Sequence, residues 1–442
     1  MSDPTDTTET IGARVRQLRL IRDYSLQELG RHAHVSASQL CRIEKGDRYP
    51  SEPILAAVAR ALGVSVSVLR GQPYIQALQG EQLDALLTPL SAAFDDWDLP
   101  PTDAPPPRSL TTLETAIREL IALRVQASFT KLAERLPGLV SEIAIATQLQ
   151  PAGHRQERAH ALQAEAARTA AIVAYRLGYM DLARLALTRM AVAAPHSGDP
   201  RQVAIERYER AQMAADSSRL SRGVSLMRHA LRDLDDDGDR ATQAVRGTLQ
   251  LRAAVLSARD GDDSAADDWL GQATELARAT GETRHHALAF GPLNVRLHQI
   301  AAAGDRDDHA RALEYARTVH LPDGYAPTRA AHYWIDRARA EAWTAKRPAA
   351  LASLHAARTA SAQLTRYHHS VHETVATLLR ARQRAEEPLR EFAAWCGVYL
   401  PGVPVARPRA HRGPRPPPRH TSTSLRCQPI GPDSTPSDGG TV

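Results

Sequence analysis

The chain has few of the features that mark secreted, membrane or metal-binding proteins. Its three cysteines, Cys41, Cys396 and Cys427, are odd in number and far apart, which argues against a disulfide framework or a zinc site. No run of about 18 apolar residues occurs, so we expect no membrane-spanning helix. The acidic and polar start, MSDPTDTTET, lacks the features of a signal peptide. These absences predict a cytoplasmic protein without membrane contact.

Aromatic residues and lysine are also scarce. Aromatic residues make up 5% of the chain while alanine is abundant, which favours helices over sheets. Lysine occurs only at positions 45, 131 and 346, so arginine supplies the other 52 of the 55 basic residues, as in proteins from GC-rich genomes. Residues 11–71 hold ten basic and five acidic residues, and residues 401–442 hold six and two. Basic charge concentrated at the front of the chain indicates contact with phosphates.

The sequence contains no constellation typical of an enzyme. It has no Walker loop, no G-x-G-x-x-G and no nucleophile elbow. His368 and His372 have the spacing of a two-histidine metal face, but no third ligand is apparent. Residues 235–239, DDDGD, lack the twelfth-position glutamate of a calcium loop, so we interpret them as a charged connecting loop. We therefore predict no catalytic residues, no metal and no cofactor.

Residues 25–48 predict two short helices joined by a tight turn. Ser25 and Glu28 have the spacing of a capping box at the start of the first helix. Ser36 can cap the second helix, and Gly46 ends it. Because apolar side chains recur at helical spacing through both segments, each helix has one buried side.

The second of these helices has a short, mixed polar face. With Leu40 and Ile43 turned inward, Ser38, Gln39 and Arg42 are left to face outward. Side chains of this kind can form hydrogen bonds with the edges of DNA bases.

These residues resemble the helix-turn-helix domain of the lambda repressor/Cro family, also called the XRE family. The matching segments are SLQEL (25–29), VS (35–36), SQL (38–40), RIEKG (42–46) and Pro50, and the resemblance covers about residues 10–71. It implies a five-helix, all-α head that binds double-stranded DNA. It also implies that the helix Ser36–Arg42 lies in the major groove.

The resemblance assigns roles to individual residues. Ser38, Gln39 and Arg42 map onto base-contacting positions, with Arg42 the best candidate for a bidentate bond to guanine; the alternative is that Arg42 contacts only phosphate. Arg19 and Glu44 map onto positions that form a buried ion pair. The remaining candidates contact the phosphate backbone: Arg14, Gln27, Ser36, Lys45 and Arg48.

Three positions depart from the family pattern. Leu26 stands where the family often has a phosphate-contacting glutamine, with Gln27 beside it. His34 replaces the usual turn glycine, so it must accept a positive φ or a shifted turn. Gly30 replaces the usual alanine, which costs helix stability but preserves close helix packing.

The rest of the chain divides by composition. Residues 1–10 and the Pro/Arg-rich tail 401–442 are expected to be disordered. The predicted helix-turn-helix domain spans 11–71 and ends with a short fifth helix at 65–69. A connecting helix at 81–98 and a Pro-rich linker occupy the segment 72–108. Residues 109–400 are expected to form an α-helical repeat domain.

The repeats are visible as five alanine-rich helix pairs. Their second helices are predicted to begin near residues 181, 221, 263, 307 and 348, a period of about 40–44 residues. The pattern resembles tetratricopeptide repeats, which implies a solenoid of stacked helix pairs. An irregular α-helical array is the alternative.

A possible ligand groove lies on the first helices of these pairs. Asn294 and Arg296 interrupt the alanine-rich pattern, and together with Tyr333 and Arg337 they are the candidates to bind an effector. Four aromatic residues could join them, namely Tyr175, Tyr179, Tyr208 and Trp334. The alternative is an exposed polar face over aromatic core residues.

Together these features predict a sequence-specific, DNA-binding transcriptional regulator associated with the nucleoid. One short recognition helix reads few base pairs, so we expect a homodimer on an operator. The helical repeats are predicted to sense a peptide or a small molecule, to mediate dimerisation, or both. This arrangement resembles the peptide-responsive regulators of Gram-positive bacteria and the large helical XRE regulators of actinomycetes. The alternative is a protein-interaction scaffold whose DNA binding is incidental.

Overall fold

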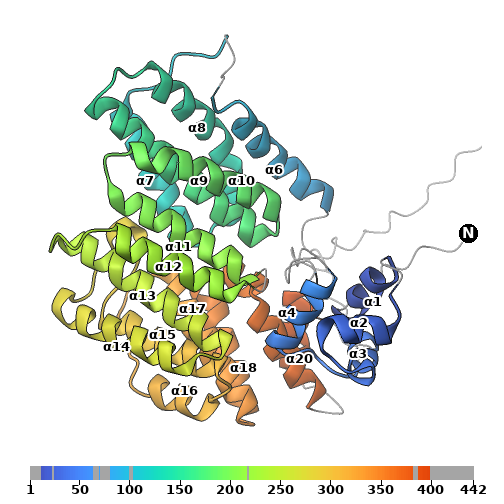
Figure 1. The fold of residues 1–442 in the computed structure, drawn as a ribbon. Helices are drawn as coiled ribbons and strands as arrows, with labels where there is room; N and C mark the ends of the chain where they lie inside the picture. The colour runs from blue at the N-terminus through green and yellow to red at the C-terminus, as the bar shows by residue number, and fades with distance from the viewer. Residues whose placement is uncertain are drawn as a thin grey trace, which may run out of the picture. The chain divides into compact units, whose positions relative to one another are not determined.

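The structure is a computed structural model that describes residues 11–21, 24–62, 69, 80–98, 103–216, 219–381 and 387–398. This described part consists of α-helices and two short 3-10 turns, without a β-strand, which confirms the all-α fold class (Figure 1). None of its helices is long and apolar enough to cross a membrane. The predicted disordered ends, 1–10 and 401–442, lie outside the described residues, as does the predicted fifth helix apart from Leu69.

The head contains α1 (Ile11–Ile21), α2 (Leu26–Ala33), α3 (Ala37–Glu44) and α4 (Glu52–Ala61). Helix α2 begins with the capping box: Glu28 N–H donates to Ser25 Oγ (3.1 Å), and Ser25 N–H donates to Glu28 Oε2 (2.7 Å). The helices enclose a small core whose fully buried side chains include Leu29, Leu40 and Leu55. This core fixes which face of α3 is left outside.

The turn between α2 and α3 is tight. His34 adopts the left-handed conformation, with φ 53° and ψ 37°, and the Val35 N–H donates to the Gly30 carbonyl at 3.0 Å. A Cβ on Gly30 would lie 2.6 Å from the Val35 carbonyl oxygen. Glycine at this position therefore permits the close approach of the two helices.

Beyond the head, α6 (Gly80–Asp95) precedes a series of helix pairs. In each pair the two helices pack against each other. The pairs are α7 (Leu110–Val125) with α8 (Phe129–Leu149), α9 (His154–Leu177) with α10 (Met180–Ala193), α11 (Pro200–Asp216) with α12 (Leu220–Asp233), α13 (Arg240–Asp260) with α14 (Asp263–Thr280), α15 (Pro292–Asp305) with α16 (His309–Ala316), and α17 (Pro327–Trp343) with α18 (Arg347–Ala360). The short turns η1 (Ala194–His196) and η2 (His285–Ala287) precede α11 and α15, and α19 (Ala362–Tyr367), α20 (His369–Arg380) and α21 (Glu387–Cys396) follow the last pair.

The first helices of consecutive pairs form a layer of their own. Helix α9 packs on α11, α11 on α13, α13 on α15 and α15 on α17 (Figure 1). The second helices begin within two residues of the predicted starts: Met180, Leu220, Asp263, His309 and Arg347. The stacked helix pairs therefore confirm the predicted helical-repeat body.

The same backbone turn joins the two helices of every pair. In all six turns an N–H donates to the carbonyl five residues earlier at 2.8–2.9 Å, as from Tyr179 to Ala174, from Asp262 to Ser257 and from Lys346 to Glu341. This is the long bond of a Schellman turn, which requires a left-handed residue just before the donor. In the described turns that residue has a positive φ: Ala127, Gly178, Gly261, Asp307 and Ala345.

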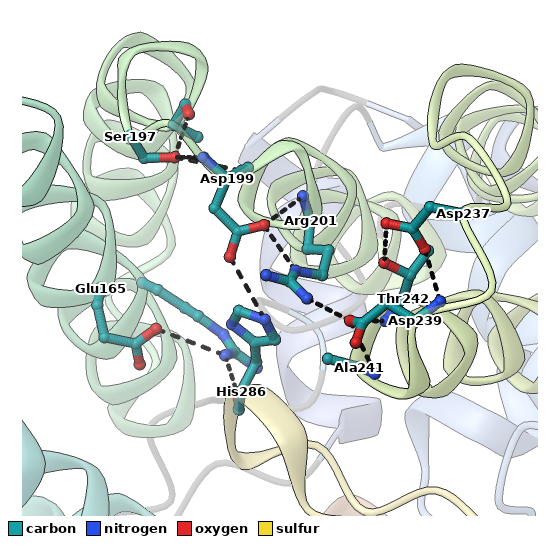
Figure 2. A network of polar contacts seen from close by, with 11 residues as sticks. Glu165, Ser197, Asp199, Arg201, Asp237, Asp239, Ala241, Thr242 and His286 are labelled. Carbon is teal, nitrogen blue, oxygen red and sulfur yellow. Dashed lines mark hydrogen bonds and ion pairs between the residues drawn. The ribbon is translucent and has the colours of Figure 1, made fainter. Parts of the chain in front are cut away.

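Polar contacts tie neighbouring pairs together at one edge (Figure 2). Asp199, just before α11, accepts a hydrogen bond from Arg201 Nε (2.7 Å), and Arg201 Nη1 pairs with Asp239 Oδ2 (2.7 Å). Asp239 also caps α13 by accepting from the N–H groups of Ala241 and Thr242. In this structure the acidic loop 235–239 thus begins a helix and binds the preceding pair.

The first and last parts of the body also meet. Helix α19 packs against α9, and the Phe129 N–H donates to Gln363 Oε1 at 2.7 Å across 234 residues of chain. Leu364 belongs to the same buried cluster as Phe129 and Leu132. The series of pairs is therefore closed by a contact between its two ends.

Close packing in the middle of the body depends on Gly247 in α13. A Cβ on Gly247 would lie 1.9 Å from Cζ of Phe290, whose ring is fully buried. Gly271 in α14 offers a matched control, because a Cβ there would meet no atom within 4 Å.

We expect Gly247→Ala and Gly271→Ala to change stability in opposite directions. Gly247→Ala should cost about 1–3 kcal/mol, because the Phe290 ring or the backbone must move. Gly271→Ala should add about 0.5–1 kcal/mol, because alanine loses less backbone entropy in a helix. Thermal melts of the two variants beside the parent chain measure both effects. Equal shifts in the same direction would contradict the packing described for Gly247.

Candidate functional site

Helix α3 presents an exposed polar face to solvent. Ser38, Arg42 and Lys45 are exposed and recur at four and then three residues, so they lie on one side of the helix. Gln39 is half-buried beside them. Leu40 and Ile43 on the opposite side are buried in the head. The core therefore holds the polar face in a fixed orientation.

The charges around this face have no partners within the described part of the chain. Arg42, Lys45 and Arg48 are exposed, and their side chains make no hydrogen bond or ion pair there. The Ser36 hydroxyl accepts a hydrogen bond from the Gln39 N–H (3.2 Å) and so caps the start of α3. These unpaired cations lie in the last turn of α3, at its C-cap and in the segment that follows, and their exposed positive charge is suited to binding phosphate.

An ion pair between Arg19 and Glu44 fixes α1 to the end of α3. Arg19 Nε and Nη2 donate to the two carboxylate oxygens of Glu44 at 2.7 and 2.9 Å, and Nη1 donates to the Tyr24 carbonyl at 2.7 Å. Both side chains are largely buried. This bidentate pair positions the helix and leaves neither group free for DNA.

The other two phosphate candidates lie apart from α3. Arg14 on α1 is half-buried, and its Nη1 lies 3.5 Å from the Leu69 carbonyl. Gln27 is exposed in the first turn of α2. The exposed candidates are thus on α2, on α3 and in the segment after α3.

A second candidate site lies among the first helices of the body. Two cavities, of about 180 and 580 Å³, share a set of lining residues. The larger has the volume of a typical small-molecule site. The shared residues come from α9, α11, α13 and α17: Tyr175, Arg176, Gln212, Arg252, Arg329 and His332.

The lining arginines fall into two groups. Arg259 and Arg339 both pair with Asp305, at 3.0 and 2.9 Å. Arg176, Arg252 and Arg329 form no ion pair with a carboxylate in the described part of the chain, although Arg329 lies near enough to Asp336 to lower the pKa of that carboxyl. An excess of positive charge therefore faces the shared part of the cavities.

Two histidines beside these arginines are held neutral. Burial, together with Arg329 and Arg252, lowers the pKa of His298 to about 3. Burial lowers the pKa of His332 well below its usual value, with His368, Arg176, Arg329 and Arg252 adding to the effect. At neutral pH both rings can accept or donate a hydrogen bond without carrying charge.

The four groove candidates chosen from the sequence lie elsewhere. Asn294 is fully buried and its amide donates to the Ala289 carbonyl at 2.7 Å. Arg296 stacks on Tyr315. Tyr333 is buried, and Arg337 pairs with Glu341 at 2.9 Å. None of the four lines either cavity, and their role in ligand binding stays a prediction.

The cavity residues that the sequence interpretation missed carry a spacing signal. Arg252 and Arg259 are seven residues apart on α13, and Arg329, His332 and Asp336 follow at three and four residues on α17. Such spacing places each set on one helix face. Tyr175 and Tyr208, which the sequence interpretation did consider, line the larger cavity.

Comparison with known proteins agrees with the head described above. A family model described as a helix-turn-helix domain matches residues 10–70. A comparison with curated proteins gave no match. Among solved structures, the chain is similar to PlcR of Bacillus thuringiensis in complex with the peptide PapR7 and DNA. That similarity has 14% identity and a TM-score of 0.34, over 70% of this chain and 95% of that chain. The chain therefore joins a helix-turn-helix domain to a helical-repeat body.

Asp336 gives the body a pH-dependent stability. Burial, aided by the charge of Asp305, raises the pKa of this carboxyl to about 7, against the opposing effects of Arg339, Arg259 and Arg329. Because the pKa in the unfolded chain is about 3.9, ionisation of Asp336 destabilises the folded state increasingly between about pH 4 and pH 7.

We therefore expect Asp336→Asn to raise the melting temperature at pH 8 more than at pH 5. Melting curves at the two pH values measure this difference. Asp181→Asn is the control, because its side chain is 99% exposed, and it should shift the melting temperature little at either pH. A gain for Asp336→Asn that is the same at both pH values would contradict the assignment.

Proposed function

We propose that this protein is a sequence-specific transcriptional regulator in which the head binds an operator and the body senses a ligand. The observation that carries the proposal is the exposed face of α3, with its unpaired Arg42 and Lys45. A fixed helix with a polar face and free cations has the properties required to enter a major groove.

Within this proposal the head residues divide into two groups. Arg42, Ser38 and Gln39 contact base edges, with Arg42 bidentate to guanine. Lys45 and Arg48 hold phosphates and supply affinity without sequence preference. Three further residues complete the phosphate contacts: Arg14, Gln27 and Ser36.

We also propose that the regulator binds as a homodimer. Helix α3 as a whole covers about two helical turns (Ala37–Glu44), which is enough to read only a few base pairs. Two heads on related half-sites would supply the missing specificity. The repeat body is the candidate for the dimer contact, and its ligand is a peptide or a small molecule.

Substitutions on α3 test the division between base and phosphate contacts. Arg42→Ala should cost about 1–3 kcal/mol of discrimination between the operator and scrambled DNA. Lys45→Ala should weaken binding to both DNAs alike and reduce the salt slope by about one. Arg60→Ala, on the exposed side of α4, is a charge-matched control that should leave discrimination unchanged. Fluorescence anisotropy over a range of salt concentrations measures these quantities, and the reverse pattern for Arg42 and Lys45 would refute the roles.

Binding-site selection from random duplexes with the full chain tests the dimer. We expect a two-fold symmetric site whose half-sites are about one helical turn apart or a multiple of it. Sedimentation of the protein with the selected duplex should give two chains per site. A selected site without symmetry would count against the homodimer. Equal and steeply salt-dependent binding to all duplexes would support an interaction scaffold with incidental DNA binding.

A further inference from the structure

The body contains buried and half-buried arginines, most of which have a carboxylate partner. Arg124 pairs with Glu165 at 2.6 Å, Arg168 pairs with Glu209 at 2.9 Å, and Arg259 and Arg339 share Asp305. A buried guanidinium normally has such a partner, because taking an unpaired charge out of water is costly.

Arg176, Arg252 and Arg329 are half-buried and have no such partner. They come from α9, α13 and α17 and line both cavities. Arg176 packs over the ring of Tyr175, and the side chain of Arg329 makes no hydrogen bond or ion pair with any described residue. All three also act on His332, whose pKa they lower together, so their charges converge on one region.

Arg252 is held in place by neutral groups. Its guanidinium stacks 4.3 Å from the centre of the Tyr208 ring, donates to Tyr208 Oη at 2.6 Å and donates to Gln212 Oε1. Gln212 in turn donates to Tyr175 Oη at 3.1 Å. The Nε–H of Arg252 is buried and has no hydrogen-bond partner. This side chain is therefore positioned without its charge being neutralised.

The larger cavity continues from these arginines into an apolar part. This part is lined by Phe129, Ile172, Leu288 and Leu364. All of these except Ile172 are buried in the core. Its volume of about 580 Å³ exceeds the needs of a single inorganic ion and lies within the usual range for organic ligands.

We propose that this cavity binds a small amphiphilic organic anion, with its carboxylate or phosphate group held between Arg176, Arg252 and Arg329. The apolar part of the ligand lies against Phe129, Ile172, Leu288 and Leu364. Guanidinium groups recognise either oxyanion through paired N–H donors. This inference rests on the proposed sensing role of the body and names the chemical class of its ligand.

Four probes with the same eight-carbon chain test the proposal on the full-length protein. Octanoate and octyl phosphate, each below the concentration at which it forms micelles, should raise the melting temperature saturably and give heat in calorimetric titrations. Octylammonium and 1-octanol should not. The stronger of the two anions identifies carboxylate or phosphate as the preferred group. Failure of both anions to bind, or equal binding of 1-octanol, would overturn the proposal.

Substitutions place the binding in the cavity. Arg329→Met should weaken the better anion about tenfold or more, the loss expected for a hydrogen-bonded charge. Arg252→Met should do the same. If Arg252→Met does not fold, Arg329→Met remains informative, because the Arg329 side chain makes no hydrogen bond or ion pair in the described part that the substitution would remove. Arg232→Met is the control, since its side chain is 69% exposed and lines neither cavity. Equal affinity in the parent chain and Arg329→Met would refute the site.

Measuring operator affinity with and without the bound anion distinguishes a failure of the anion site from a failure of the proposed regulatory function. A change in operator affinity that Arg329→Met removes supports both. Anion binding that leaves operator affinity unchanged supports the site and contradicts the sensing role. Specific operator binding by a chain that binds no anion contradicts the site and leaves the DNA-binding function intact.

Discussion

One type of backbone hydrogen bond, repeated in turn after turn, determines how consecutive helices of this protein are arranged. It runs from an N–H to the carbonyl five residues earlier, and it occurs between α2 and α3 in the head and in all six helix pairs of the body. The bond turns the chain back on itself in few residues, so consecutive helices must pack side by side. In the head this turn sets the direction in which α3 leaves the core. In the body it separates first helices from second helices and so creates the layer that surrounds the cavities.

The layer of first helices explains why charged groups from distant parts of the sequence meet. Arg176, Arg252 and Arg329 are each more than seventy positions from the next in the sequence, yet all three lie on first helices. Since consecutive first helices pack on one another, a side chain on their shared face has its neighbours on other repeats. A site built this way draws one or two residues from each repeat, and no short motif marks it in the sequence.

The sequence was sufficient to predict features that depend on neighbouring residues. The capping box at Ser25 and the starts of the second helices follow from local spacing and turn chemistry. For His34 the sequence left open a positive φ or a shifted turn, and the structure shows the positive φ. It was insufficient for features that depend on how a helix is rotated about its axis. Helix α13 has its own buried alanine, leucine and small polar residues on nearly all of its sides. Its hydrophobic pattern therefore does not single out the face that carries Arg252. Asn294 stood out as a polar residue in an apolar run, but its side-chain amide donates a buried hydrogen bond to the Ala289 carbonyl.

The hydrogen bond between Phe129 and Gln363 has a consequence for the order in which the chain folds during its synthesis. Repeats of this kind can fold one after another as they leave the ribosome, because each needs only its neighbour. The bond across 234 residues cannot form until the segment after α18 has been made, and closing so long a loop carries an additional entropic cost. The body would therefore spend most of its synthesis as an open stack. The cavity walls from α9 and α17 would come together only when translation of the helical body is almost complete.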